Sequence, residues 1–412
     1  MIDQVVGIGL PRLVLFPILA SLLGERSFGA FVVALGLIQI VGLSPSNGLI
    51  AYVIRDLSRH SEAERALMTR TAMLLSLAVV GPIGLGYMLC TGAIARAYGG
   101  AQFLALVPGL AVFLILTNVV EVSLSTHRVE RAFGRIAFVH LVQAVALFTG
   151  IPLYYAFGVG GVATGYVVAG SCALAVAVAA RPDLRTGRLF ASAFARPAMR
   201  VWFPFSISSF ITLSAGYLDR VLLGYWWSPA DVAPFFAATS TAAIFLMPAT
   251  LASNLILSLL GKVQGRASLG PGFYGRYAAA ALAFSAIVFA VGAAIGPLIV
   301  RLLYPAFFAD AQPLWIGAMG AFSIMGIQAF ARPFVCKFLA PGWLPVLAGA
   351  GLVARVLPLV LLVPTGGAAG AVTALLIGSI VTSLIWATAF VNGFIRKGAE
   401  LDATACAESL VD

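Results

Sequence analysis

This chain of 412 residues consists almost entirely of long apolar segments separated by short gaps. Apolar residues make up 61% of it and charged residues only 10%, whereas soluble proteins average roughly 45–50% and about 25%. A helix that crosses a bilayer needs about 20 apolar residues. The sequence therefore predicts an all-α polytopic membrane protein with twelve transmembrane helices. The predicted segments are residues 5–23, 28–54, 70–92, 102–125, 136–157, 159–180, 202–227, 231–260, 277–302, 312–335, 343–363 and 368–394.

Lysine and arginine are distributed unequally between the gaps. Nineteen of the 25 fall in the gaps after the even-numbered segments and in the C-terminal tail, whereas only Arg26, Arg96 and Arg301 fall in the opposite gaps. Because cytoplasmic loops are enriched in these residues, both termini are predicted to be cytoplasmic. The net charge of +10 is then an insertion signal, and we expect no nucleic-acid partner.

The chain also contains an internal repeat. The stretch Gly158–Gly165 reads like Gly367–Ala374 after a shift of 209 residues, and Leu22-Leu23-Gly24 is echoed by Leu222-Leu223-Gly224. Two copies with an even number of helices are parallel repeats, which are typical of transporters. The predicted domains are an N-terminal six-helix lobe at 1–180, a basic cytoplasmic linker at 181–201, a C-terminal six-helix lobe at 202–394 and a cytoplasmic tail at 395–412.

Motifs of enzyme chemistry are not found in the sequence. It contains no H-E-x-x-H, no Walker loop and no G-x-S-x-G, and its four cysteines, Cys90, Cys172, Cys336 and Cys406, have no metal-binding spacing. We therefore predict no catalytic residue, no metal and no cofactor, and the chain is not expected to be an enzyme.

Charged residues within the apolar segments are the main functional signal, because they are costly in hydrocarbon and tend to face a cavity or a partner. Asp219 and Arg220 lie deep in segment 202–227. Ser208, Thr212 and Ala215 share one helical face with Asp219. Side chains of adjacent residues on a helix point in different directions. We therefore expect that Asp219 and Arg220 do not simply neutralise each other's charge. Asp219 is a candidate proton or cation site and Arg220 an anion contact. The alternative is a structural ion pair to another helix.

Three further basic residues are candidates for substrate binding. Arg12 lies in the first segment and Arg355 in the middle of segment 343–363. An arginine inside a span needs a counter-charge, water or a phosphate; the alternatives are snorkelling for Arg12 and a buried bridge for Arg355. Arg55 and Asp56 close the second segment, where they either gate the cytoplasmic mouth or anchor the helix at the interface.

Two residues of the N-terminal lobe are candidates for ion coupling or gating. Glu121 lies near the cytoplasmic end of segment 102–125, from where its carboxylate could also reach water. His140, one turn into segment 136–157, could titrate near neutral pH, or it could be a hydrogen-bonded packing residue. Basic residues outnumber acids inside the spans, and a basic interior suits an anionic ligand such as a phosphate or pyrophosphate.

Several of these motifs resemble a known family. They are Leu22-Leu23-Gly24 with Phe28-Gly29, Tyr217-Leu218-Asp219-Arg220 with Leu222-Leu223-Gly224, Pro248, and the Gly158–Gly165 pattern. Together with twelve spans they resemble the polysaccharide and O-antigen flippases of the multidrug/oligosaccharidyl-lipid/polysaccharide exporter superfamily. The chain departs from that family after the seventh segment, where Ala233-Pro234-Phe235 replaces a frequent Gly-x-Tyr.

The resemblance implies a V-shaped, two-lobed transporter with a central cavity in the bacterial inner membrane. Its substrate would be a polyprenyl-pyrophosphate-linked oligosaccharide for lipopolysaccharide or exopolysaccharide, flipped by alternating access with Arg12, Arg220 and Arg355 meeting the pyrophosphate. Expected partners are this substrate, membrane lipids and other polysaccharide-assembly membrane proteins, with the chain itself a monomer. The alternatives are a proton- or sodium-coupled multidrug exporter of the same superfamily and, in another class, a membrane-embedded glycan polymerase or acyltransferase.

Overall fold

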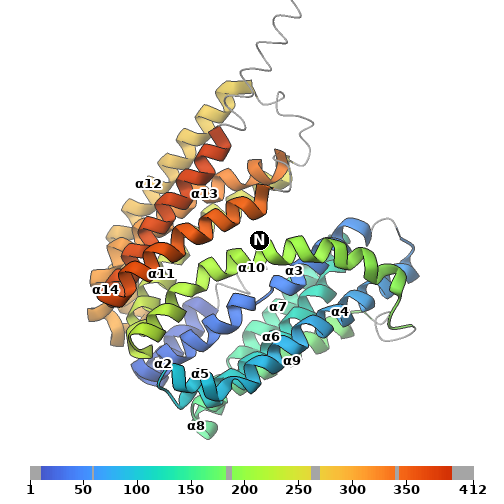
Figure 1. The fold of residues 1–412 in the computed structure, drawn as a ribbon, viewed down its shortest axis with the longest axis horizontal. Coiled ribbons are helices and arrows are strands. Elements are labelled where there is room, and N and C mark those ends of the chain that lie inside the picture. Colours follow the sequence, from blue (N-terminus) through green and yellow to red (C-terminus); the bar gives the residue numbers. More distant parts are fainter. Residues whose placement is uncertain (1–10, 58–59, 182–187, 261–269, 339–342, 392–412) are drawn as a thin grey trace, which may run out of the picture. The chain divides into compact units, whose positions relative to one another are not determined.

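The structure, a computed structural model, describes residues 11–57, 60–181, 188–260, 270–338 and 343–391. These residues form helices and short connections, and none of them is in a strand, which confirms the predicted all-α class (Figure 1). Ten of the helices are long and apolar enough to cross a membrane. The protein is thus a multi-pass membrane protein.

The helices fall into two compact units, Met1–Phe236 and Ala237–Asp412. The first contains η2 Pro11–Leu15, α2 Phe16–Val41, α3 Ser44–Asp56, α4 Glu62–Leu89, α5 Thr91–Ala97, α6 Gln102–Val129, α7 Phe133–Leu147, α8 Gly150–Phe157, α9 Val159–Ala179, α10 Ser192–Trp226 and the start of α11 Pro229–Leu260. The second contains the rest of α11, α12 Gly270–Leu303, η6 Pro305–Phe307, α13 Phe308–Phe338 and α14 Trp343–Phe390.

Two of the ten helices each hold two predicted segments. In α2 the backbone of Gly24 is non-helical at φ 68°, and the rings of Phe16 and Phe31 lie 5.9 Å apart, although 15 residues of straight helix would span roughly 22 Å. In α14 the break is Gly367 at φ 54°, and a Cβ on Gly378 would lie 2.8 Å from Cγ of Arg355. The chain therefore reverses at both glycines, so these ten helices correspond to the twelve predicted segments, of which residues 5–10 and 392–394 lie outside the described residues.

The repeat at a shift of 209 residues has the same geometry in both copies. Gly158 has φ 59° and ψ −143°, and Gly367 has φ 54° and ψ −134°. A Cβ on Gly161 would lie 2.0 Å from the carbonyl oxygen of Leu153, and one on Gly370 would lie 2.2 Å from that of Leu362. Both hairpins thus need a left-handed turn and then a close backbone contact, and only glycine meets both needs.

The Leu-Leu-Gly match has a different geometry in its two copies. Gly24 forms the turn between two helices, whereas Gly224 lies inside α10, which continues to Trp226. The second copy therefore turns a few residues later than the first. The same three amino acids therefore occupy different structural positions in the two copies.

The long helix α10 lies beside α3 in the first unit (Figure 1). The indole Nε1 of Trp202 donates a hydrogen bond to the carbonyl oxygen of Pro45 at 2.8 Å. Asn47 donates to the hydroxyl of Ser209 at 3.2 Å. A Cβ on Gly48 would lie 2.5 Å from the carbonyl oxygen of Trp202, so the two backbones approach closely, as small residues allow between membrane helices.

α10 also begins ten residues before the predicted start at 202. The predicted linker at 181–201 lies partly outside the described residues, and the proposed lobe boundaries stay a prediction.

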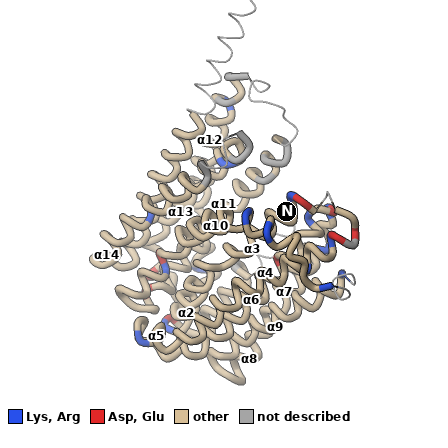
Figure 2. Tube along the Cα trace, turned by 45° about the vertical axis from the view of Figure 1, so that its right-hand side comes forward, with Lys and Arg blue, Asp and Glu red and all other residues tan. Residues whose placement is uncertain are grey.

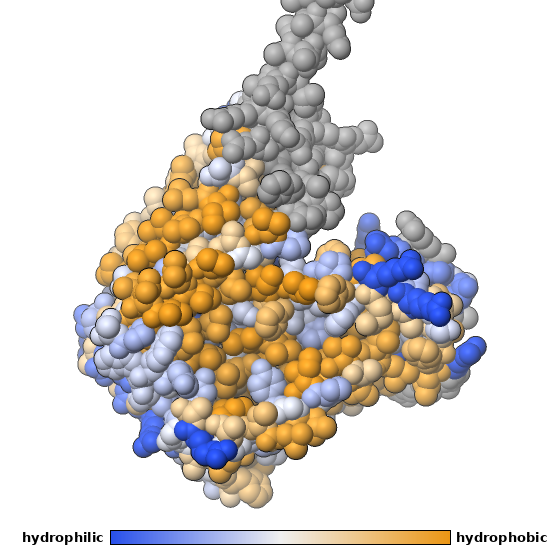
Figure 3. Space-filling view, viewed as in Figure 1, coloured by the Kyte–Doolittle hydropathy of each residue, from blue (hydrophilic) through white to orange (hydrophobic). Residues whose placement is uncertain are grey.

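The surface is consistent with a surrounding bilayer. Large apolar side chains are exposed on both units, including Leu85, Leu298 and Leu361. Figure 3 shows a broad apolar area on one face of the molecule. Figure 2 shows that lysine, arginine and the acids of the first unit gather near its ends, with few between them. This distribution places the apolar middle in hydrocarbon and the charges near water.

The shared hairpin geometry predicts a matched effect of two substitutions. Gly161→Ala and Gly370→Ala each place a methyl group against a backbone carbonyl, so each is expected to destabilise the protein by about 1–3 kcal/mol. The measurement is the thermal unfolding midpoint of the purified protein in detergent. Gly160→Ala is the control, because its Cβ would meet Ala105 at an ordinary 3.6 Å. Equal midpoints for all three variants would contradict the hairpin geometry.

Candidate functional site

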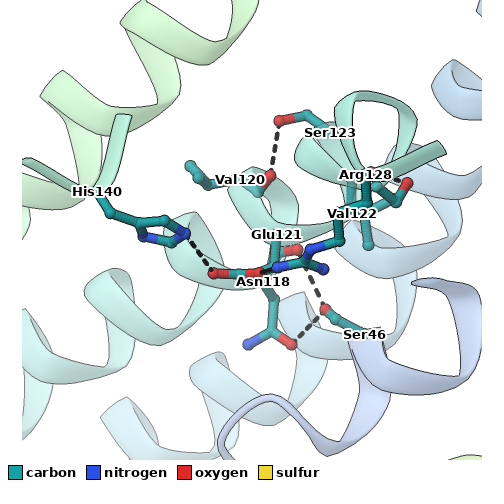
Figure 4. A network of polar contacts seen from close by, with 9 residues as sticks. Ser46, Asn118, Val120, Glu121, Val122, Ser123, Arg128 and His140 are labelled. Carbon is teal, nitrogen blue, oxygen red and sulfur yellow. Dashed lines mark hydrogen bonds and ion pairs between the residues drawn. The ribbon is translucent and has the colours of Figure 1, made fainter. Parts of the chain in front are cut away.

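The first unit contains a buried carboxylate. Glu121 on α6 is only 8% exposed. Its Oε2 accepts a charge-assisted hydrogen bond from Arg128, and its Oε1 lies 3.5 Å from Nε2 of His140 on α7 (Figure 4). Arg128 reaches Glu121 because seven residues are two helical turns, which places both on one face of α6. Both predicted residues of the N-terminal lobe, Glu121 and His140, are therefore in one cluster, and Glu121 does not simply face water.

A second polar group adjoins this cluster one turn earlier on α6. The amide nitrogen of Asn118 donates to the carbonyl oxygens of Gly42 and Leu114 at 2.9 and 2.8 Å. Its Oδ1 accepts from the hydroxyl of Ser46, which also lies 3.2 Å from the hydroxyl of Ser76 (Figure 4). Four helices thus meet around one amide.

The amide of Asn118 stabilises an interruption in a transmembrane helix. Gly42, with φ 39° and ψ −129°, separates α2 from α3 inside the predicted segment 28–54. A Cβ there would lie 2.4 Å from the carbonyl oxygen of Gln39, so the turn requires glycine. Asn118 gives the carbonyl of Gly42 a hydrogen-bond donor. Irregular backbone at membrane depth is tolerated where the protein satisfies it, and such breaks mark functional sites in transporters.

Asp219 and Arg220 on α10 form the third group. Oδ1 of Asp219 accepts from the backbone N–H of Arg220 at 2.8 Å and lies 3.9 Å from its Nε. The two side chains therefore lie beside each other on α10, and the expectation that the pair does not simply neutralise itself stays a prediction. The guanidinium lies over the rings of Tyr217 and Phe236, 5.4 and 5.0 Å from their centroids. Arg220 thus combines an adjacent carboxylate with two aromatic faces.

The remaining predicted residues lie elsewhere. Arg55, which is 60% exposed, donates to Asp56 at 3.1 Å, and this hydrogen bond to the carboxylate raises the pKa of Arg55. Arg355 is buried in the second unit against Gly378 of the same hairpin. Arg12 lies in η2, and its side chain is outside the described residues.

The structure therefore assembles three pairs in the first unit: Glu121 with His140, Asp219 with Arg220, and Arg55 with Asp56. Sequence reasoning missed Arg128 as the partner of Glu121, although their spacing of seven residues was a usable signal. Among the described residues, no three His, Cys, Asp or Glu side chains are grouped to hold a metal.

The buried ion pair predicts a non-additive effect on stability. Arg128→Gln leaves the carboxylate of Glu121 without its arginine, which is expected to cost about 1–3 kcal/mol. The double variant Glu121→Gln/Arg128→Gln removes both charges and is expected to recover most of this loss. Thermal unfolding of the two single variants and the double variant measures the coupling. Strictly additive shifts would show that the pair contributes nothing.

The fold is similar to those of known transporters. An inward-facing multidrug resistance transporter of the MATE family of the MOP superfamily matches with a TM-score of 0.78 and 16% identity, over 97% of this chain and 96% of that one. The lipid II flippase MurJ in an inward closed conformation matches with a TM-score of 0.74 and 12% identity, over 100% and 91%. An outward-facing structure of a MATE family transporter gives 0.69 and 16%, over 97% and 94%.

At these identities the structures establish the fold, and the sequence comparison establishes the family. No curated protein sequence matches the chain. The family described as "Polysaccharide biosynthesis protein" matches residues 18–311, which is well over half of the 412 residues. With its all-helical fold shared with MOP-superfamily transporters, the chain belongs to this polysaccharide biosynthesis protein family.

Proposed function

We propose that this protein flips a polyprenyl-pyrophosphate-linked oligosaccharide from the cytoplasmic to the outer leaflet of a bacterial inner membrane. It would work by alternating access and serve the export of a surface polysaccharide. The family and the transporter fold support a membrane transporter in polysaccharide biosynthesis. The lipid-linked substrate, the inner membrane and the cytoplasmic termini are part of the proposal.

The environment of Arg220 is the observation that carries this proposal. Its guanidinium lies over the rings of two aromatic residues, Tyr217 and Phe236, and its Nε is buried with no hydrogen-bond partner among the described residues. A planar guanidinium has five donors and binds phosphate oxygens in pairs. Arg220 can therefore offer donors to a pyrophosphate while the rings fix its plane. We propose Arg12, Arg355 and Arg55 as further contacts to the same anionic substrate.

Ion coupling would use the acids and the histidine of the first unit. Glu121 and His140 can share a proton, because Nε2 and Oε1 lie 3.5 Å apart. Asp219 and Asp56 are proposed as further coupling or gating residues. Membrane lipids and other polysaccharide-assembly proteins are proposed partners, and the protein is proposed to act as a monomer.

A coupled multidrug exporter is the second candidate, since the MATE transporters share the fold. A cationic drug would need an acid free to receive it. The two buried acids deep within the spans of the first unit, Glu121 and Asp219, each lie beside an arginine, which favours an anionic substrate. No specific observation favours a glycan polymerase or acyltransferase.

Disruption of the gene tests the function directly. We expect a polyprenyl-linked repeat unit to accumulate on the cytoplasmic side of the membrane, measured by extraction and mass spectrometry of lipid-linked sugars. Complementation with the wild-type gene is the control. Unchanged lipid-linked sugars together with altered drug sensitivity would favour the multidrug exporter instead.

Substitution of Arg220 tests the substrate contact. Arg220→Ala is expected to lower surface glycan at least tenfold at matched protein level, since a lost charged hydrogen bond costs about 1.5–3 kcal/mol. Arg220→Lys keeps the charge without the planar fork and is expected to be intermediate. Arg355→Ala is expected to reduce transport as well. Normal glycan in both alanine variants would refute the assignment.

A further inference from the structure

One face of α10 is exposed along its cytoplasmic half. On this face basic side chains come first and large apolar side chains follow. Arg196 and Arg200 come first, followed by Phe203, Ile207 and Phe210. The two arginines are exposed, and so are the apolar residues, at 60%, 39% and 44%. These five residues are called the α10 stripe below.

The spacing of the stripe puts its members on a single helical face. Successive members are four or three residues apart, which is the recurrence of one side of an α-helix. The opposite face packs on α3, where Gly48 contacts Trp202 and Ser206. The next position along the stripe is Ser214, which is only 4% exposed. The exposed stripe is therefore confined to the cytoplasmic half of the helix.

The length of α10 sets the depth of the stripe. Its 35 residues would extend over about 52 Å, well beyond the roughly 30 Å of hydrocarbon in a bilayer. The apolar part of this helix was predicted to begin at residue 202. Arg196 and Arg200 therefore lie at the level of the lipid headgroups, and Phe203, Ile207 and Phe210 lie at the level of the acyl chains.

The stripe thus matches a molecule with an anionic head and a long hydrocarbon tail. Its two arginines are one helical turn apart, and side chains at this spacing have Cβ atoms about 5–6 Å apart. Two neighbouring guanidinium groups suit the two linked phosphates of a pyrophosphate better than the single phosphate of an ordinary phospholipid. The apolar residues continue in line with the arginines, where the tail would follow.

We propose that the α10 stripe is the docking surface on which a polyprenyl pyrophosphate is loaded from the cytoplasmic leaflet. Arg196 and Arg200 bind the pyrophosphate, and Phe203, Ile207 and Phe210 contact the prenyl chain. This inference rests on the proposed function and adds two arginines that lie outside the site predicted from the sequence.

The test measures binding to the purified full chain in detergent by native mass spectrometry. The probe is undecaprenyl pyrophosphate without sugar, compared with phosphatidylglycerol and with inorganic pyrophosphate. Arg196→Gln/Arg200→Gln is expected to weaken binding of the prenyl probe about tenfold or more. Phe203→Ser/Ile207→Ser is expected to weaken binding of undecaprenyl pyrophosphate. Its binding of inorganic pyrophosphate is expected to be as weak as that of the unsubstituted protein. Arg96→Gln/Arg301→Gln removes the same charge from exposed positions in the opposite gaps and is the matched control.

Two results would overturn the proposal. One is equal affinity for the prenyl probe in the stripe variant and in the control variant. The other is equal binding of phosphatidylglycerol and undecaprenyl pyrophosphate, which would make the stripe an ordinary lipid contact. Either result leaves the proposed flippase intact if disruption of the gene still causes lipid-linked sugar to accumulate. Unchanged lipid-linked sugars would instead refute the function itself.

Discussion

Hydrocarbon cannot hydrogen-bond, so every polar group of the backbone must find its partner inside the protein. This constraint accounts for the continuous helices and for the places where they are interrupted. At Gly42 the helix stops inside the predicted span, and the amide of Asn118 donates to the carbonyl that loses its helical partner. The reversals at Gly158 and Gly367 use left-handed glycines, so the chain turns with little unpaired backbone.

The same constraint governs charge. Glu121 is buried with Arg128 and His140 around it, and Asp219 lies beside Arg220. Breaking such a pair by removing one partner leaves a buried charge without compensation, which costs more than removing both. Each of these two buried acids therefore lies beside a cation.

Much of the fold could be predicted from the sequence, because span length and apolar composition are properties of single segments. The Gly158–Gly165 repeat could also be recognised in the sequence, because the local backbone geometry requires its glycines. The break at Gly42 could not be predicted in this way, because it depends on Asn118, which lies 76 residues away in sequence. The packing of α10 on α3 was missed for the same reason. It depends on contacts such as that between Trp202 and Pro45, and repeat symmetry says nothing about them.

α10 shows why the candidate site is hard to assign to one copy of the repeat. By sequence it opens the second copy, yet it packs with the helices of the first unit. The boundary between the units falls within α11, after Phe236. The ring of Phe236 lies under the guanidinium of Arg220 and also packs against Phe16 and Phe28. Arg220 thus contacts the last residue of the first unit, at the point where the chain passes into the second. All of these contacts lie within the first unit, so Arg220 is held by the first unit although its helix opens the second copy of the repeat.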